Sequence, residues 1–444
     1  MLREEILQKI ESAGIVGAGG AGFPTHVKAK ADADVVIANC AECEPMLKVD
    51  KNLMETFPDK IVGGVSALME ATGAKKGYIA VKSKNHKACE VMEKAVKRKA
   101  DIEVFQLDNY YPAGDEQQIV YGITGNVVPV GGIPLDVGAV VCNASTLYNI
   151  SEALEDRPVT EKFVTVNGDV VNPVTLRVPV GMPVSALIKA AGGTLRGGLD
   201  GYSLITGGPM MGAVSKDFES PVTKTTSGVI VLDDAHKLIR KKTSSLDVEH
   251  KIAKAACCQF NLCSYMCPRN LLGLNVQPHL VMRATAYGNK DAAGKGDITF
   301  GCCDCGLCTH FACPMGLSPG RFISRVKAEL LAKGIKPEKI HSKGVSDTRS
   351  LTRTPTKRLV ERLGLSAYQS EAPLDISPLN ADSVRIMLKQ HIGAPSEPVV
   401  KKGDRVEKGA VIARTPQGKL GAFMHASISG HVSDVTDSYI EIKA

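Results

Sequence analysis

The chain has 444 residues, a formal net charge of +7 and 44% hydrophobic residues, which is enough for about two to four soluble domains with buried cores. Aromatic residues make up only 5% and Trp is absent, which argues against a surface that stacks nucleic-acid bases, so we expect no nucleic-acid partner. No run of about 18 apolar residues is present, and the N-terminus is acidic and amphipathic rather than a secretion signal. We therefore expect a cytoplasmic protein without an integral membrane segment.

Residues 1–155 alternate between helical and strand patterns. Short buried strands are predicted at 33–39, 77–81 and 139–143, and helices at 62–71 and 88–99. This alternation is typical of a Rossmann-like α/β domain that binds its ligand at the carboxyl ends of the strands.

A glycine-rich segment, GAGGAGFPTHVK, runs from Gly17 to Lys28 and satisfies G-x-G-x-x-G. That motif is weak evidence alone, and it follows an amphipathic helix rather than a strand, so a standard nicotinamide fingerprint is not indicated. Polar residues that follow the predicted strands or lie in a nearby turn strengthen the case: Asn39, Glu42, Glu44, Gly114, Glu116, Asn143 and Thr146. Together they predict a nucleotide crevice, with ordinary turns as the alternative interpretation.

Two further segments have β-rich patterns. Residues 159–235 begin with an expected hairpin around an Asn-Gly turn at 162–181, followed by a short helix at 184–193, which suggests a β-grasp module. Residues 385–444 contain repeated short strands with glycine turns and are typical of a lipoyl-like barrel-sandwich.

Thirteen cysteines are present, and nine of them lie within 257–313. An odd count without a secretion signal argues against a disulfide framework and favours metal ligation in a reducing compartment. The cysteine region, with flanking helices at about 245–335, is predicted to be a separate α-helical, ferredoxin-like domain with two clusters.

The second cysteine motif has the cleaner spacing. Cys302, Cys305 and Cys308 form C-x2-C-x2-C, and Cys313-Pro314 follows. This spacing predicts a [4Fe–4S] cluster and fits paired zinc knuckles poorly.

The first motif, CCQFNLCSYMCP, is an internal repeat of the second, but Phe260 stands where Cys305 stands. Either Cys258 replaces the missing ligand, which we favour, or this cluster has three protein thiolates and settles as [3Fe–4S]. Cys303 is then the spare cysteine of the second motif. In the crossed arrangement typical of such pairs, one cluster takes Cys257, Cys258, Cys263 and Cys313, and the other takes Cys302, Cys305, Cys308 and Cys267.

The glycine segment, NCAECEP, YPAGDEQQIVYGITG, VPVGGIPLDVG and the two Cys-Pro motifs together resemble one family across nearly the whole chain. It comprises the C subunit of the Rnf electron-transport complex and the cobalamin reductase of propanediol-utilisation microcompartments. The N-terminal part also resembles the FMN-binding subunit of respiratory complex I, although Ala41 and Ser145 replace an Asp and a Glu of that pattern.

The resemblance implies bound FMN, two iron–sulfur clusters, NADH as substrate and a corrinoid, free or on a partner enzyme, as acceptor. Its site residues map onto Gly17, Gly19, Gly20, Gly22, Lys28, Asn39, Glu42, Glu44, Gly114, Glu116, Asn143 and Thr146. It also implies a microcompartment location, with a shell protein or an adenosyltransferase as partner. Two alternatives stay open: an electron-input subunit of an Rnf-type membrane complex, and a non-catalytic iron–sulfur scaffold.

Overall fold

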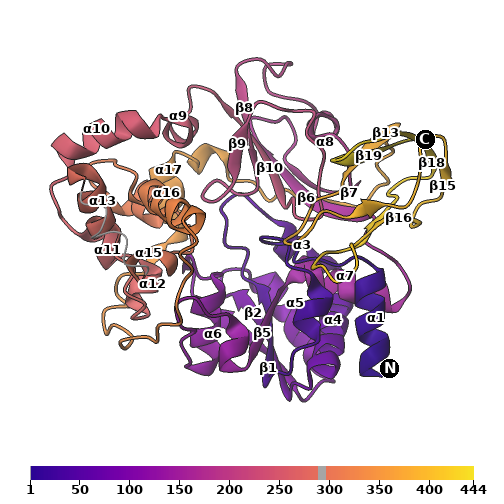
Figure 1. Cartoon of the computed structure of the whole chain (residues 1–444), viewed down its shortest axis with the longest axis horizontal. Helices are drawn as coiled ribbons and strands as arrows, with labels where there is room; N and C mark the ends of the chain where they lie inside the picture. Colours follow the sequence, from indigo (N-terminus) through magenta and orange to yellow (C-terminus); the bar gives the residue numbers. More distant parts are fainter. Residues whose placement is uncertain (1, 289–296) are drawn as a thin grey trace.

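The computed structural model of the chain describes residues 2–288 and 297–444 (Figure 1). It contains five sheets, and the helices gather around two of its regions: the N-terminal domain and the cysteine region. Among the described residues, no helix is both long enough and apolar enough to span a bilayer.

The N-terminal domain is built on a parallel sheet with strand order β3-β2-β1-β5. The strands are β1 (Val35–Cys40), β2 (Lys76–Lys82), β3 (Ile102–Leu107) and β5 (Ala139–Asn143). Three of them match the predicted segments, whereas β3 lies at the edge of the sheet with a mixed exposure pattern and was not anticipated. Apolar strand residues pack on both faces, so the sheet forms the central layer of an α/β domain.

Helices cover both faces of this sheet. One core cluster brings together the strands and three helices that contact one another: α1 (Arg3–Ser12), α4 (Pro58–Thr72) and α7 (Ala144–Leu154). The other face is covered by α6 (Glu116–Thr124). The remaining helices of the domain are α2 (Thr25–Ala29), α3 (Val49–Thr56) and α5 (His86–Val96). The predicted helices at 62–71 and 88–99 correspond to α4 and α5.

The β-grasp module has a mixed sheet of order β12-β7-β6-β10-β8-β9. Its elements are β6 (Glu161–Gly168), β7 (Val174–Pro179), α8 (Val184–Ala190), β8 (Tyr202–Thr206), β9 (Ala213–Ser215), β10 (Gly228–Asp233) and, from later in the chain, β12 (Leu374–Asp375). The hairpin prediction is right for β6 and β7, but Asn167-Gly168 is not its turn. Gly168 ends β6, where a Cβ atom would lie 2.0 Å from the Val231 carbonyl oxygen, so glycine serves close strand packing there.

The cysteine region is mainly helical and lies on the left of Figure 1. Its helices are α9 (Lys237–Thr243), α10 (Leu246–Ala256), α11 (Leu262–Tyr265), α12 (Pro268–Leu271), α13 (Pro278–Tyr287), α15 (Asp297–Phe300), a π-helical turn at Cys308–Ala312 and α16 (Pro319–Ala332). The next segment returns to the N-terminal domain, where β11 (Thr354–Pro355) pairs with β4 (Tyr110–Tyr111) before α17 (Thr356–Leu363).

The C-terminal domain is a sandwich of two small sheets. One sheet contains β13 (Ser383–Met387), β19 (Tyr439–Lys443), β18 (Gly430–Val435) and β15 (Arg405–Val406), and the other contains β14 (Glu397–Pro398), β16 (Val411–Arg414) and β17 (Met424–His425). Residues from both sheets share one core, as a barrel-sandwich requires.

One hydrophobic cluster joins three of these regions and α17. It contains Met46 and Leu47 from the N-terminal domain, Ile205 and Met210 from the β-grasp module, and Cys305 from the cysteine region, together with Leu359 of α17 and other residues. The loop that carries Cys305 is therefore packed against the N-terminal domain and the β-grasp module.

Candidate functional site

A cavity of about 660 Å³ lies at the carboxyl ends of the parallel strands in the N-terminal domain. It is within the usual size range of cofactor sites. All twelve predicted binding residues line it: Gly17, Gly19, Gly20, Gly22, Lys28, Asn39, Glu42, Glu44, Gly114, Glu116, Asn143 and Thr146. The residues that the sequence singled out are thus brought to one place by the fold.

The glycine loop presents its backbone to this cavity. Among the described residues, the N–H groups of Gly19 and Gly20 have no protein acceptor. A Cβ atom on Gly19 would lie 2.8 Å from the Asn143 side chain, whereas a Cβ atom on Gly20 would meet no atom within 4 Å. Unpaired N–H groups beside open space fit the phosphate of a flavin nucleotide.

Two further features favour an anion here. Helix α7 begins at the cavity, with Asn143 as its N-cap accepting from the Ser145 N–H at 2.9 Å. The Lys28 ammonium donates to the Val141 carbonyl oxygen at 2.8 Å and lies 3.8 Å from the Glu116 carboxylate. A helix N-terminus and a lysine on one cavity complement a phosphate group.

A buried polar network supports the cavity wall. The Glu42 carboxylate accepts from the N–H groups of Asp50 and Lys51 at the start of α3. Asn143 donates to both Asp50 carboxylate oxygens, at 3.0 and 3.1 Å. Burial, with the nearby Asp50 carboxylate, raises the pKa of Glu42, and burial also raises that of Asp50. Glu42 and Asn143 therefore shape the cavity through hydrogen bonds to the protein.

Glu44 joins the N-terminal domain to the β-grasp module. Its two carboxylate oxygens accept from the N–H groups of Met210, at 2.8 Å, and Met211, at 2.9 Å. Gly208 is required for this approach, because a Cβ atom there would lie 2.2 Å from the carboxylate. Burial raises the pKa of Glu44 to about 6. Glu44 thus holds the TGGPMMG loop against the cavity.

Contacts from the β-grasp module and the C-terminal domain hold the glycine loop in place. Lys162 of β6 is buried and donates to the Ala18 carbonyl oxygen at 3.0 Å, and the Ile392 N–H donates to the Gly22 carbonyl oxygen at 3.1 Å. Thr146 of α7 accepts from the Ala18 N–H at 3.0 Å. Three separate segments therefore fix the backbone that faces the cavity.

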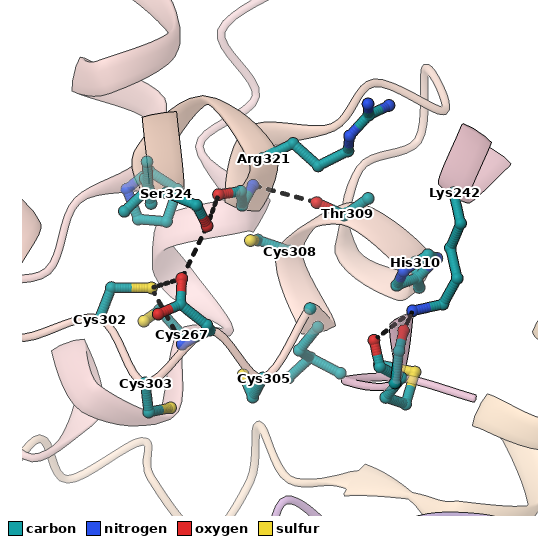
Figure 2. Close-up of a pocket in the computed structure, with 18 of the residues that line it drawn as sticks. Lys242, Cys267, Cys302, Cys303, Cys305, Cys308, Thr309, His310, Arg321 and Ser324 are labelled. Atoms are coloured by element: carbon teal, nitrogen blue, oxygen red, sulfur yellow. Dashed lines mark hydrogen bonds between the residues drawn. The ribbon is translucent and has the colours of Figure 1, made fainter. Parts of the chain in front are cut away.

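A second cavity, of about 550 Å³, lies among the cysteines. Cys267, Cys302, Cys305 and Cys308 line it, and Figure 2 shows the sulfur atoms of Cys302, Cys267 and Cys308 directed towards a shared space. Cys303 also lines the cavity, but its side chain points away from these three sulfur atoms. The four residues predicted for the second cluster are therefore together, and they fit a thiolate-bound cluster in identity and number.

The first cysteine group is less complete. Cys257 and Cys313 pack against the same hydrophobic cluster, and α11, which contains Cys263, contacts the π-helical turn that precedes Cys313. Burial raises the pKa of the Cys263 thiol to about 11. Cys258 differs from our expectation: it is exposed, and its thiol donates to the Ala256 carbonyl oxygen at 3.4 Å. The structure describes no set of three Cys, His, Asp or Glu side chains close enough for a single metal ion.

The two cavities meet at the loop of the second cluster. Cys303 and Cys305 line both of them. Tyr111, which lines the larger cavity, donates its hydroxyl hydrogen to the Cys305 carbonyl oxygen at 2.7 Å. A ligand in the larger cavity is therefore adjacent to the second cluster's binding loop.

Buried polar contacts hold this junction together. Arg269 forms a two-pronged ion pair with Asp115, with donor–acceptor distances of 2.8 and 2.6 Å, and both side chains are about nine-tenths buried. Gln118 donates to the Pro268 carbonyl oxygen at 2.8 Å. Sequence reasoning missed the roles of Tyr111, Arg269 and Asp50, because their partners are distant in the chain and no local motif marks them.

Replacing Gly20 tests the flavin position. Gly20→Val should lower the FMN content of the purified protein severalfold, because the valine side chain would occupy cavity space that contains no protein atom in the wild type. The fold should be unaffected for the same reason. The FMN released on denaturation, measured by fluorescence, and the thermal unfolding midpoint check this.

The matched control for that variant is Gly198→Val, since Gly198 also has no atom within 4 Å of a Cβ position but does not line the cavity. It should retain full FMN. Equal FMN content in the two variants would contradict the assignment of the glycine loop.

The buried Glu42 carboxyl should make stability depend on pH. Its folded-state pKa is raised from an ordinary 4.5 to about 8, so its contribution is fully present below 4.5 and is lost as the pH rises through about 8. Between about pH 6 and about pH 9, which spans this pKa, the thermal unfolding midpoint of the wild type should fall more than that of Glu42→Gln. Identical pH slopes in the two proteins would refute this account of Glu42.

Comparison with protein-family models matches four regions of the chain. They are the Nuo51 FMN-binding domain over residues 10–152, the SLBB domain over 163–214, the 4Fe-4S dicluster domain over 256–318 and the RnfC barrel sandwich hybrid domain over 367–444. These matches confirm the predicted fold class, with an FMN domain, a β-grasp module, a two-cluster region and a C-terminal barrel-sandwich. They also confirm FMN and iron–sulfur clusters as the cofactors.

Curated relatives extend the similarity to the whole chain. Cobalamin reductase PduS of Citrobacter freundii is 40% identical over 99% of this chain and 96% of its own length, and PduS of Salmonella typhimurium is 40% identical over the same shares. The C subunit of the Na⁺-translocating ferredoxin:NAD⁺ oxidoreductase complex of Acetobacterium woodii is 35% identical over 62% of this chain and 60% of its own length. The chain belongs to the family of the cobalamin reductase PduS.

Proposed function

We propose that this protein is an NADH-dependent reductase that delivers electrons to a corrinoid through FMN and two iron–sulfur clusters. The observation that carries the proposal is the shared wall of the two cavities, in which Cys303 and Cys305 line both the flavin cavity and the cluster cavity. The relatives named cobalamin reductase, similar over nearly their whole length, support the corrinoid as acceptor.

When bound, FMN converts the electron pair of a hydride into single electrons, and the clusters carry one electron each. The chain's own residues position these groups. Lys28, the loop N–H groups and the start of α7 hold the flavin phosphate, and Tyr111 fixes the loop that carries Cys305. No acid–base side chain is needed for electron passage, so the protein contributes placement and electrostatic environment.

The proposed order of electron transfer follows from position. The second cluster, on Cys267, Cys302, Cys305 and Cys308, adjoins the flavin cavity. The cysteines of the first cluster do not line that cavity. Cys257 follows α10, Cys263 lies in α11 and Cys313 follows the π-helical turn; α10 and α11 lie on the left of Figure 1. Electrons would pass from the flavin to the second cluster, then to the first and to the acceptor.

The resemblance to propanediol-utilisation proteins also motivates a proposal about place and partners. The protein would work in a microcompartment, beside a shell protein or an adenosyltransferase that uses the reduced corrinoid. Co-purification of one of these from cells that form microcompartments would support this assignment.

Anaerobic spectroscopy tests the reductase activity directly. NADH should bleach the flavin absorption of the reconstituted protein, and free cobalamin added without membranes should then be reduced catalytically. The Gly20→Val variant should lose both reactions in proportion to its FMN content, whereas Gly198→Val should keep them.

Two results would contradict the proposal at different points. A loaded flavin that NADH fails to bleach would remove NADH as the reductant. A flavin that bleaches while cobalamin stays oxidised, even after long incubation, would remove free corrinoid as the acceptor and would favour the membrane-complex alternative.

A further inference from the structure

The two cysteine loops share two left-handed backbone positions. Gln259 and Asp304, at matching positions of the repeat, both have φ of +54°. Two positions later, the matching residues Asn261 and Gly306 have φ of +58° and +72°. Left-handed residues are uncommon, so their recurrence at two matching positions shows that the loops are structural repeats. A position that serves as a ligand in one loop therefore has a defined counterpart in the other.

The residue after the first left-handed position is a predicted cluster ligand in the second loop. There it is Cys305, which is 9% exposed and lines the cluster cavity. Its counterpart in the first loop is Phe260, which is 61% exposed and has no atom that binds iron. The first loop thus lacks a ligand at the one position where this backbone supplies it.

Cys258 lies at the wrong position in the loop to supply the ligand that is missing at Phe260. Its counterpart is Cys303, whose side chain points away from the sulfur atoms of Cys302, Cys267 and Cys308 (Figure 2). Cys258 is likewise directed elsewhere, since it is exposed and donates to the Ala256 carbonyl oxygen at 3.4 Å.

In each loop the sulfur of the first cysteine accepts a hydrogen bond from the left-handed residue two positions later, although the donors differ. The Gln259 side chain donates to the Cys257 sulfur at 3.1 Å, and the Asp304 N–H donates to the Cys302 sulfur at 3.4 Å. These contacts hold the first loop in the form of the second, with Cys257 in the ligand position.

We propose that the first cluster is held by only three protein thiolates, from Cys257, Cys263 and Cys313, which leaves one iron position without a protein ligand. The inference rests on the proposed function, because it assumes that this site carries a cluster. Phe260, Leu262, Tyr265 and Met315, which are close to these cysteines in the sequence, are all exposed. The open position takes a small oxygen- or sulfur-donor ligand from solvent, and its iron is the one lost first on oxidation.

Spectroscopy of matched variants tests this inference without an activity assay. After mild oxidation, the wild type should show the EPR signal of a three-iron cluster, and its iron content should fall short of two complete cubes by about one atom per chain. Phe260→Cys should remove that signal and restore the iron. Cys258→Ser should behave as the wild type, and Cys263→Ser should lose the first cluster.

A small thiol gives a second readout. Added 2-mercaptoethanol should change the EPR spectrum of the reduced first cluster in the wild type and have no effect in Phe260→Cys. Loss of the first cluster in Cys258→Ser, or full iron retention by the oxidised wild type, would overturn the inference. Protein without any iron after anaerobic reconstitution would instead defeat the proposed function itself.

Discussion

The buried ion pair between Arg269 and Asp115 is the contact on which the rest of the arrangement depends. Arg269 follows the Cys267-Pro268 end of the first cysteine motif, and Asp115 lies between two residues of the flavin cavity, Gly114 and Glu116. Removing one partner of such a pair leaves an uncompensated buried charge and costs about 3–5 kcal/mol. The pair therefore fixes the segment that follows Cys267 relative to the larger cavity more firmly than an exposed contact could.

The shared hydrophobic cluster has the same effect over a wider area. Because Cys305 packs in one core with residues of the N-terminal domain and the β-grasp module, the second cluster's loop cannot move independently of them. The Tyr111–Cys305 hydrogen bond is enclosed by this core. Three of the four regions recognisable in the sequence thus share one core beside two neighbouring cavities, which suits electron transfer because its rate falls steeply with distance.

Sequence reasoning succeeded where local patterns carry the information. The parallel strands β1, β2 and β5 followed from short apolar runs, and the cavity residues followed from their place after those strands. Cysteine spacing, with the crossed arrangement typical of paired clusters, singled out the four cysteines that line the second cavity.

Local sequence patterns were less informative where segments that are distant in the chain meet. Lys162 supports the glycine loop from 144 residues away, and no local motif announces that contact. Glu44 lines the predicted cavity, but no local motif marks the two N–H groups of the β-grasp module that donate to its carboxylate. Spacing alone permits either Cys258 or an open position at Phe260, and the proposal between them depends on the backbone of both loops.

The central claim, that electrons reach the first cluster only through the second, is tested most directly by rapid anaerobic reduction of two cluster-deficient variants. In Cys305→Ser, with iron analysis showing that only the first cluster remains, NADH should bleach the flavin while the first cluster stays oxidised. In Cys263→Ser, the flavin and the second cluster should both be reduced as in the wild type. Reduction of the first cluster in Cys305→Ser at the wild-type rate would contradict the account.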